Sequence, residues 1–433
     1  MGSSFPATDC YSLINARLVT PPGQTCPSGV SVSSGLITRV FRTGDAALRE
    51  GEAVFDVHGA IVAPGFIDMH VHGGGGADAL DGTAEAFLTM ARAHAAGGST
   101  AIVPTIMTAP DDDLIASMRA FDDAVNAQDD LLGRQQRASS LSGARMSPGH
   151  RNKSQAGPGP GARLLGLHLE GPYFSPVQRG AQDKRFLRLP ERSHFEKVLG
   201  ASKRILRVSA APELPGAFEL GRELAGRGIV AAIGHSDATY DEVVTAVESG
   251  YSHVTHLYSA MSTVKRVNCF RVPGVLEAAL ALDQLTVEVI ADGKHLPGSL
   301  LALTHKIKGP DRVALVSDAL RPAGLGEGEY ITGSARGSGQ RVIVDQGVAW
   351  MPDREAFAGS VVLAADLVRN MVNLARVPLC DAITMASLTP ARILGLDSRM
   401  GSLTPGKDAN MVVLGEDLAV RMTIVEGRLC YMA

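Results

Sequence analysis

The sequence predicts an α/β fold, a (β/α)8 TIM-like barrel with a small β-sandwich domain built from both chain termini. Three observations predict it. Eight apolar, strand-like runs cross the middle of the 433-residue chain, helix-like stretches separate most of them, and short strand signals punctuated by Gly and Pro occur at both ends. Parallel strands buried on both faces are nearly continuous in apolar residues, and eight of them alternating with helices close into a barrel.

The expected barrel strands alternate with helix-period stretches such as 83–97 and 238–250. In chain order the strand-like runs are IVAPGFIDMHVH (61–72), GSTAIVPTIM (98–107), RLLGLHLE (163–170), ILRVSAA (205–211), GIVAAIGH (228–235), SHVTHLY (252–258), LTVEVIA (285–291) and RVALVSD (312–318).

This pattern divides the chain into three parts. Residues 1–62 and 401–433 carry short strand signals and are expected to form the two halves of the sandwich, and residues 63–400 are expected to form the barrel. Residues 133–162 interrupt the barrel pattern, because they are rich in Ser, Gly, Arg, Pro and Gln and nearly lack apolar side chains. Such a composition predicts a disordered insertion, and a basic docking arm is the less favoured alternative.

The composition is that of a soluble protein with a large core, since 45% of the residues are hydrophobic and 20% are charged. A net charge of −4 gives no indication of a nucleic-acid or membrane partner. The five cysteines are scattered without a CxxC pair, which favours a reducing compartment. No secretory signal is visible, and no apolar run reaches the roughly 18 to 20 residues of a membrane span. A cytoplasmic protein is expected.

Polar residues fall at the ends of six of the eight expected strands. In this fold the carboxyl ends of the strands meet at one mouth, where active sites are built. The six strand ends are His70-Val-His72, His168-Leu-Glu170, Gly234-His235, Thr255-His256, the segment from Asp292 to His295, and Ser317-Asp318. A two-residue period places His70 and His72 on one face of their strand. Imidazole and carboxylate donors of this kind suit Zn²⁺, Fe²⁺, Mn²⁺ or Co²⁺.

A single histidine at a strand end, such as His235, is more often a hydrogen-bonded core residue than a metal ligand. Six coordinated placements favour metal binding for the set. His168 lies one strand period before Glu170, so we interpret it as a packed or supporting residue rather than a ligand. The other histidines fall on loops, helices or the opposite strand face and receive no role; they are His58, His94, His150, His194, His253 and His305.

Several motifs then resemble one enzyme family. PGFIDMHVHG (64–73) resembles the opening motif of the amidohydrolase superfamily. Six further motifs resemble those of the N-acetylglucosamine-6-phosphate deacetylase family. They are LGLHLEGPYFSP (165–176), IGHSDATY (233–240), VTHLYSAM (254–261), IADGKH (290–295), LVSDALRPAG (315–324) and the tail motif GSLTPGKDANMVVL (401–414). The resemblance covers nearly the whole chain apart from 133–162. It implies a barrel enzyme that hydrolyses the acetyl amide of N-acetylglucosamine 6-phosphate to glucosamine 6-phosphate and acetate, in amino-sugar catabolism.

The resemblance also implies roles for particular residues. Glu170, His235 and His256 match the common metal ligands. His70 and His72 match the extra ligands of members with a second metal, so one or two divalent cations per subunit are expected. Asp318 matches the catalytic acid/base. The phosphosugar contacts match Ala181, Ser259, Ala260, Arg271, Asp292, His295, Ala358, Gly359 and Ser360. Because the matching Arg comes from the neighbouring subunit in the family, a homodimer is expected.

The residues are chemically suited to this reaction without the resemblance. Bound metal activates water and polarises a carbonyl, and a carboxylate such as Asp318 can carry the proton from water to the leaving amine. No Lys ends strand four (RVSAAPE), so Glu170 is the available bridging ligand. The chain departs from the family's pattern at two positions. It has Ser259 where family members often have Asn, and Gln182 where they often have His. The stretch from Met261 to Arg271 is also several residues longer.

Two alternatives remain open from the sequence. One is another amidohydrolase, such as an acylamino-acid deacylase or a cyclic amidase; Arg271 and the DGKH segment favour a phosphosugar over these. The other is an inactive barrel that serves as a scaffold. Inactive relatives typically lose metal ligands, whereas every expected ligand and Asp318 are present here.

Overall fold

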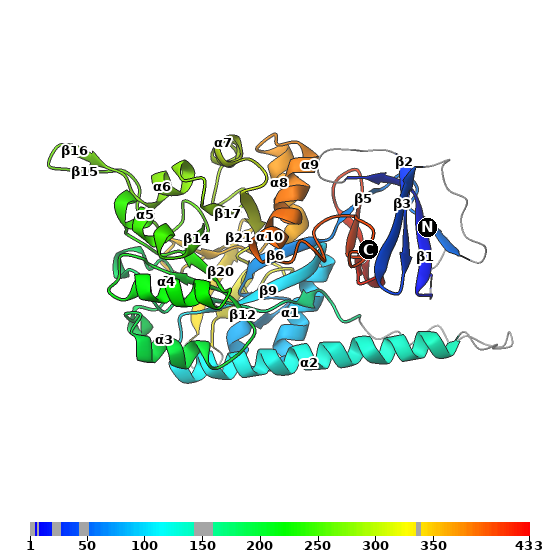
Figure 1. The fold of residues 1–433 in the computed structure, drawn as a ribbon, viewed down its shortest axis with the longest axis horizontal. Coiled ribbons are helices and arrows are strands. Elements are labelled where there is room, and N and C mark those ends of the chain that lie inside the picture. The colour runs from blue at the N-terminus through cyan, green and yellow to red at the C-terminus, as the bar shows by residue number, and fades with distance from the viewer. Residues whose placement is uncertain (1–4, 7, 20–26, 43–51, 143–158, 335–338) are drawn as a thin grey trace.

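The computed structural model describes residues 5–6, 8–19, 27–42, 52–142, 159–334 and 339–433. The chain forms a barrel with helices around it and, beside the barrel, a sheet made from both ends of the chain (Figure 1). This is the predicted α/β architecture.

The barrel strands are parallel to their neighbours and confirm the eight predicted runs, with the third run divided into two short strands. Residues just after the last strand close the barrel against the first strand, because the Asp318 N–H donates to the His70 carbonyl at 3.0 Å and Val71 bridges Ala319. The strands are β6 (Phe66–Val71), β9 (Ser99–Met107), β10 (Arg163–Leu164) with β11 (Leu167–Glu170), β12 (Ile205–Ala210), β13 (Val230–Ile233), β14 (Tyr251–Val254), β17 (Thr286–Ile290) and β18 (Val313–Val316).

The first predicted run, 61–72, is two strands that serve different sheets. β5 (Ile61–Pro64) lies in the terminal sheet, and β6 lies in the barrel. Gly65 joins them where a Cβ atom would lie 2.1 Å from the Thr100 side chain, so only glycine fits between the two sheets. A continuous apolar run cannot show this division, because both strands are fully buried.

Helices cover the outside of the barrel and bury their apolar faces against the strands. On the first two helices, the rings of Phe87 and Phe121 meet edge to face with centroids 5.3 Å apart. The helices are α1 (Ala84–Ala96), α2 (Asp111–Ser142), α3 (Arg192–Leu199), α4 (Ala217–Gly226), α5 (Tyr240–Glu248), α6 (Val275–Ala281), α7 (Gly298–Lys308), α8 (Ala364–Asn373), α9 (Leu379–Ala386) and α10 (Leu388–Ile393), with 3-10 turns η1 (Ala79–Asp81), η2 (Pro176–Gln178) and η3 (Lys184–Phe186). In the described part of the chain, no helix combines the length and the apolar character that a membrane crossing needs.

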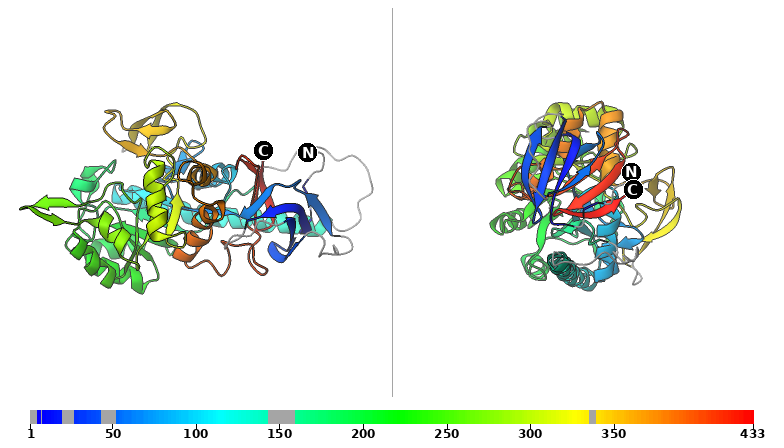
Figure 2. Two further views of the ribbon diagram at one scale, coloured as in Figure 1. Left: turned by 90° about the horizontal axis from the view of Figure 1, so that it is seen from above. Right: turned by 90° about the vertical axis from the view of Figure 1, so that its right-hand side faces the viewer.

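The terminal sheet combines strands from both ends of the chain, as predicted. Its order is β25-β24-β23-β5-β1-β2-β3, with β4 beside β1. The N-terminal and C-terminal strands lie side by side (Figure 2) and surround a core that includes Leu13, Val30, Ile37, Met411 and Ile424. The strands not yet introduced are β1 (Cys10–Leu18), β2 (Pro27–Ser33), β3 (Leu36–Arg42), β4 (Ala53–Asp56), β23 (Met411–Leu414), β24 (Val420–Val425) and β25 (Arg428–Met432).

Three small antiparallel units that the sequence did not predict interrupt the barrel pattern. A hairpin of β15 (Lys265–Val267) and β16 (Phe270–Val272) projects from one end of the molecule (Figure 1). A four-stranded sheet follows strand eight and is formed by β19 (Gly328–Thr332), β20 (Gln340–Asp345), β21 (Val348–Trp350) and β22 (Phe357–Gly359). β7 (Gly73–Gly74) pairs with β8 (Ala77–Asp78) directly after the first barrel strand.

The structure corrects both ends of the segment 133–162 that was predicted to be disordered. α2 continues through Ser142, because Arg, Gln, Ala and Leu in this stretch favour helix and an existing helix extends readily. At the other end, Ala162 is fully buried and its N–H donates to the Ala91 carbonyl at 2.9 Å. The rest of the predicted insertion, 143–158, lies outside the described residues.

Gln128 joins α2 to the start of the third barrel strand. Its buried amide nitrogen donates to the carbonyls of Pro160 and Ala162 at 2.9 and 2.8 Å, and its oxygen accepts from the Leu164 N–H at 3.1 Å.

We predict that Gln128→Leu lowers the free energy of unfolding by about 2 to 3 kcal/mol, because buried backbone groups lose their partners. Urea unfolding measures the change. Asn126→Leu, at an exposed position of the same helix, is the matched control and should change stability by less than about 0.5 kcal/mol. Equal stability of the two variants would show that the Gln128 hydrogen bonds contribute nothing.

Candidate active site

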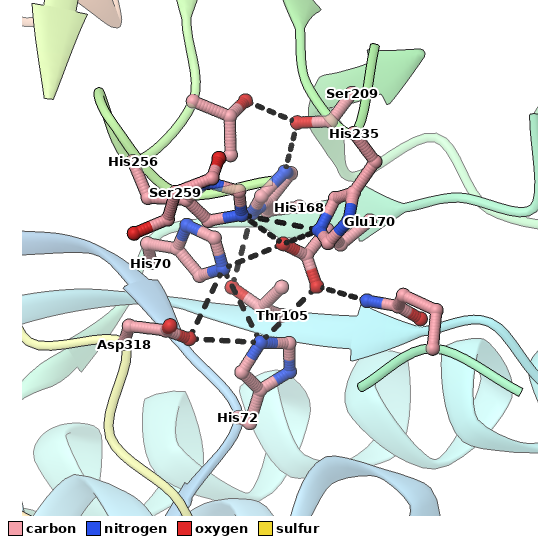
Figure 3. Close-up of polar contacts among 12 residues, drawn as sticks. His70, His72, Thr105, His168, Glu170, Ser209, His235, His256, Ser259 and Asp318 are labelled. Carbon is pink, nitrogen blue, oxygen red and sulfur yellow. Dashed lines mark hydrogen bonds and ion pairs between the residues drawn. The ribbon is translucent and has the colours of Figure 1, made fainter. Parts of the chain in front are cut away.

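The polar strand ends meet in one buried cluster at the mouth of the barrel (Figure 3). Glu170, at the end of β11, lies at its centre. His70 is the next-to-last residue of β6 and His72 directly follows the strand, while His235, His256 and Asp318 lie just beyond β13, β14 and β18. Each of these side chains is buried. Parallel strands in a closed barrel place their carboxyl ends around one opening, so residues far apart in sequence converge there.

The Glu170 carboxylate contacts four imidazole rings. Oε1 lies 3.3 and 3.0 Å from the Nε2 atoms of His235 and His256, which are 3.1 Å from each other. Oε2 lies 3.3 Å from His72 Nε2. His70 Nε2 lies 3.4 Å from Oε1 and 3.2 Å from His72 Nε2. The geometry therefore contains two three-residue groups that could each hold a metal ion and that share Glu170. We call them the HxH group (His70, His72, Glu170) and the paired-strand group (Glu170, His235, His256).

The strand-end backbone turns sharply to aim these side chains inward. His235, His256 and Asp318 have φ values of 49°, 26° and 49°, in the left-handed region that non-glycine residues rarely adopt. Such conformations cost of order 1 to 3 kcal/mol each and persist where the surrounding structure imposes them. Their coincidence with the cluster is typical of a functional site.

The outward-facing nitrogens of three imidazoles donate to fixed acceptors. The Nδ1 atom of His235 donates to the Gln178 carbonyl at 2.9 Å, that of His256 to the Ser259 carbonyl at 3.2 Å, and that of His70 to Glu288 Oε1 at 2.7 Å. These bonds leave the Nε2 lone pairs directed at one another, as metal-ligating histidines require. The donor set thus fits a divalent transition metal held by imidazole and carboxylate.

The charges of the cluster lead to the same conclusion. Burial lowers the pKa of His70, but Glu288, Glu170 and Asp318 outweigh this effect and raise the pKa to about 9. Burial also lowers the pKa of His72, but hydrogen bonds with Asp318 and Glu170 raise it well above its usual range. The three carboxylates therefore attract positive charge into the space between them, and a divalent cation can supply that charge in place of protons.

Gln182 fixes the orientation of the shared carboxylate. Its amide nitrogen donates to Glu170 Oε2 at 2.6 Å, and its amide oxygen accepts from the Thr108 N–H at 2.9 Å. The side chain is buried. A neutral amide thus lies beside the HxH group.

A cavity of about 360 Å³ opens above the cluster and is large enough for a small ligand. Glu170, His72, His235, His256 and Asp318 form part of its lining. Six of the nine predicted substrate contacts also line it, namely Ala181, Ser259, Ala260, His295, Ala358 and Gly359. The remaining lining is largely apolar, from Met107, Val177, Ile290, Ala356 and Phe357, with the polar Gln178 and Gln182 and with Gly180.

Known proteins resemble this chain in sequence and in fold. The profile of the amidohydrolase family matches residues 160–430. The N-acetylglucosamine-6-phosphate deacetylase of Vibrio furnissii is 34% identical over 371 residues, covering 86% of this chain and 83% of that protein. The N-acetylgalactosamine-6-phosphate deacetylase of Escherichia coli O157:H7 is 33% identical over 414 residues, covering 95% and 97%. A mutant N-acetyl-D-glucosamine-6-phosphate deacetylase from Mycobacterium smegmatis, solved with N-acetyl-D-glucosamine-6-phosphate, is similar with a TM-score of 0.81 and 29% identity over 98% of this chain and 100% of that chain.

This chain belongs to the N-acetylglucosamine-6-phosphate deacetylase family of the amidohydrolase superfamily. It is a hydrolase of a deacetylase family whose relatives include enzymes for two epimeric amino-sugar phosphates. The family favours a deacetylase over the alternatives of an acylamino-acid deacylase and a cyclic amidase.

Two of the residues that were predicted to contact the substrate, Asp292 and Ser360, lie behind the cavity lining. The Asp292 carboxylate accepts from the N–H groups of Lys294 and His295 at 2.8 Å and from His295 Nδ1 at 2.7 Å. Ser360 donates to the Ser317 carbonyl at 2.5 Å through its hydroxyl and to the Asp318 carbonyl at 3.0 Å through its N–H. Asp292 therefore positions His295, and Ser360 supports the backbone that carries Asp318.

Phe357 is a lining residue that the sequence did not single out. Its ring lies 4.9 Å from the His295 ring and 4.5 Å from the ring of Trp350, between centroids. This contact joins β22 of the four-stranded sheet to the loop after β17, so one wall of the cavity is aromatic. It lies in a sheet that the sequence analysis did not predict, so no motif pointed to it.

Arg271 lies away from its own chain's cavity, on the projecting β15–β16 hairpin. It is exposed, and its guanidinium donates to the Cys269 carbonyl at 3.4 Å. The hairpin also exposes Phe270 (76% accessible) and Val267 (48% accessible). Its base is tied to the site, because Lys265 Nζ lies 2.6 Å from Asp237 Oδ1, two residues after His235.

The contacts of His168 agree with its interpretation as a packed or supporting residue. His168 is fully buried, with Nδ1 3.1 Å from Thr105 Oγ1 and Nε2 2.7 Å from Ser209 Oγ, and its ring packs edge to face on His70 at 4.6 Å. It is a packed support, as the sequence predicted. His150 lies outside the described residues.

The sequence missed Glu288, Arg207 and Asp68, which are buried in the barrel interior close to the cluster. Asp68 accepts from the N–H groups of Ser317 and His70 at 3.2 and 3.3 Å, and burial raises its pKa to about 7. A charged residue inside an otherwise apolar strand run was the signal that could have found them.

Proposed function

We propose that this protein hydrolyses the acetyl amide of N-acetyl-D-glucosamine 6-phosphate to D-glucosamine 6-phosphate and acetate. The observation that carries the proposal is the convergence of four imidazole Nε2 atoms on Glu170, beside Asp318, at the floor of a cavity of about 360 Å³. Relatives that act on this sugar phosphate support the choice of substrate.

The metal ligands that we propose are Glu170, His235 and His256 for one cation, and His70, His72 and Glu170 for a second. Zn²⁺, Fe²⁺, Mn²⁺ and Co²⁺ all suit this donor set. When bound, such a cation supplies the Lewis acidity and the activation of water that amide hydrolysis needs at neutral pH.

Asp318 is the proposed acid/base. Burial raises its pKa, but His70 and His72 outweigh burial and hold the pKa below its usual value, so the carboxylate is ionised and can accept a proton. Its Oδ1 atom lies 3.2 Å from His72 Nε2, within reach of the space between the two ligand groups. Asp318 takes one proton from the attacking water and delivers it to the amine nitrogen as the C–N bond breaks, which yields acetic acid and the free amine. The acid then loses the second proton of the water to become acetate.

The sugar phosphate is proposed to occupy the cavity above this floor. His295, held by Asp292, and the segment at Ser259 and Ala260 lie on the lining, as does the segment at Ala358 and Gly359. We propose that the phosphate is bound by Arg271 of a second subunit in a homodimer. The hairpin that carries Arg271 supports this arrangement, because it exposes the apolar side chains of Val267 and Phe270, which are suited to contact with another chain.

N-acetylgalactosamine 6-phosphate is the second candidate substrate, because a relative of that activity aligns with 95% of the chain. Acetate release from N-acetylglucosamine 6-phosphate, its galacto epimer and unphosphorylated N-acetylglucosamine tests both candidates. The gluco phosphate should give the highest kcat/KM. A higher value for the galacto phosphate would reverse the order, and turnover of none would favour an inactive scaffold.

We predict that Asp318→Asn lowers kcat by at least about a hundredfold, the scale expected for the loss of an acid/base group. The amide has nearly the same volume as the carboxylate, so fold and metal content should persist. Circular dichroism and elemental analysis check both. Near-normal turnover in a metallated variant would remove Asp318 from the mechanism.

We predict up to two divalent metals per chain, with the HxH group binding the weaker one. Elemental analysis of protein from metal-supplemented medium should give more than one metal per chain, falling to about one in His70→Ala/His72→Ala. One metal per chain in the parent, together with full activity of the double variant, would leave Glu170, His235 and His256 as the ligands.

We predict that Arg271→Ala steeply raises KM for the phosphosugar and barely affects hydrolysis of the unphosphorylated sugar, because a guanidinium binds phosphate oxygens as a fork. Arg266→Ala is the matched control, since Arg266 pairs with Arg271 across the hairpin and is also exposed. Equal losses on both substrates would indicate a structural role.

Mixing variants tests whether Arg271 acts across a dimer. Arg271→Ala and Asp318→Asn proteins should each be poorly active alone. If subunits exchange after co-expression, a mixed dimer holds one site with Asp318 from one chain and Arg271 from the other, and activity should return. Failure to recover activity in a confirmed mixed dimer would place Arg271 on its own chain's site or outside it.

A further inference from the structure

A fully buried ion pair lies inside the barrel beneath the candidate metal centre. Arg207 on β12 and Glu288 on β17 have no exposed side-chain surface, and Arg207 Nη1 lies 2.5 Å from Glu288 Oε2. The interior of such a barrel is normally filled by layers of branched apolar side chains. Replacing a buried ion pair with apolar residues is often neutral or stabilising, so stability alone does not account for this pair.

The two oxygens of Glu288 have different partners. Oε2 accepts from Arg207 and from His253 Nε2, the latter at 3.3 Å. Oε1 accepts from His70 Nδ1 at 2.7 Å and from the backbone N–H of His256 at 3.0 Å. One oxygen therefore holds the carboxylate in the barrel, while the other contacts a residue of each proposed ligand group.

Each contact of Oε1 controls a ligand. The bond to His70 keeps the proton on Nδ1 and the lone pair of Nε2 directed at the HxH group. The bond to His256 holds a residue whose φ of 26° is unfavourable and needs support from its surroundings. Arg207 in turn fixes the carboxylate, because its Nη2 atom also donates to Thr255 Oγ1 at 2.8 Å, directly before His256.

We propose that Glu288, anchored by Arg207, is a positioning residue that sets the spacing between the HxH group and the paired-strand group, and thereby their affinity for metal. This inference rests on the proposed function to the extent that the centre binds metal. It differs from a purely structural role, because a structural pair would affect unfolding without changing metal affinity in the folded protein.

The test compares metal affinity in folded variants of the holoenzyme. Each protein is prepared with Co²⁺, titrated with a chelator, and followed by the Co²⁺ absorption bands and by elemental analysis, while circular dichroism reports the fold. Arg207→Met/Glu288→Leu removes both partners of the ion pair, so neither charge is left buried and unpaired. Its metal affinity should fall by at least about tenfold, the scale for supporting partners of metal ligands.

Two further variants separate position from packing. Arg207→Met/Glu288→Gln keeps an acceptor oxygen for His70 and His256 and should retain affinity within about threefold of the parent. Glu288→Asp keeps the charge but shortens the reach, so its affinity should fall by about tenfold. It also keeps a partner for Arg207, which makes it the usable variant if the double substitutions do not fold.

His253→Gln is the matched control. His253 is equally buried and contacts the other oxygen of Glu288, but among the described residues it has no hydrogen bond to His70 or His256. It should leave metal affinity unchanged. Parent-like affinity in folded Glu288→Asp and Arg207→Met/Glu288→Leu would overturn the inference and leave the proposed function intact. If the parent protein retained no Co²⁺, the proposed metal centre would be wrong, and so would this inference.

Discussion

The position of the Glu170 carboxylate is the constraint on which the rest of the structure depends. His70, His235 and His256 contact one of its oxygens, and His72 contacts the other. The histidines lie as much as 186 residues apart in the sequence, which is the separation between His70 and His256. A closed parallel barrel brings such positions together because all of its strands end at the same opening.

Converging on one carboxylate has a cost that the barrel core must offset. His235, His256 and Asp318 adopt left-handed backbone conformations, and Arg207 and Glu288 occupy an interior layer that apolar residues would otherwise fill. The Arg207 Nε atom has no hydrogen-bond partner among the described residues, so the pair is not fully satisfied. These unfavourable features are concentrated beneath and around the candidate centre, which is the distribution expected where geometry for function is retained against stability.

The same physics explains which features the sequence could predict. The barrel strands and their polar ends could be predicted, because buried parallel strands are continuous apolar runs and a polar residue at the end of such a run is easily recognised. Glu288 could not be assigned a partner, since Arg207 lies 81 residues away and the two meet only when the barrel closes. The division of run 61–72 at Gly65 was equally hidden, because both resulting strands are buried. In α2, the polar composition of 133–142 suggested disorder, but a helix that has already formed continues through residues of good helix propensity.

The two ends of the cavity differ in how firmly the fold determines them. The floor is built from strand ends, whose positions the barrel fixes. The upper lining comes from loops and from the four-stranded sheet, where Phe357 packs on His295 and Asp292 holds that imidazole. Loops can change in length and sequence without disturbing the strands beneath them. On the proposed function, relatives that act on different amino-sugar phosphates could therefore share the floor of the site, while residues of the upper lining, which the fold class alone does not specify, would select the epimer.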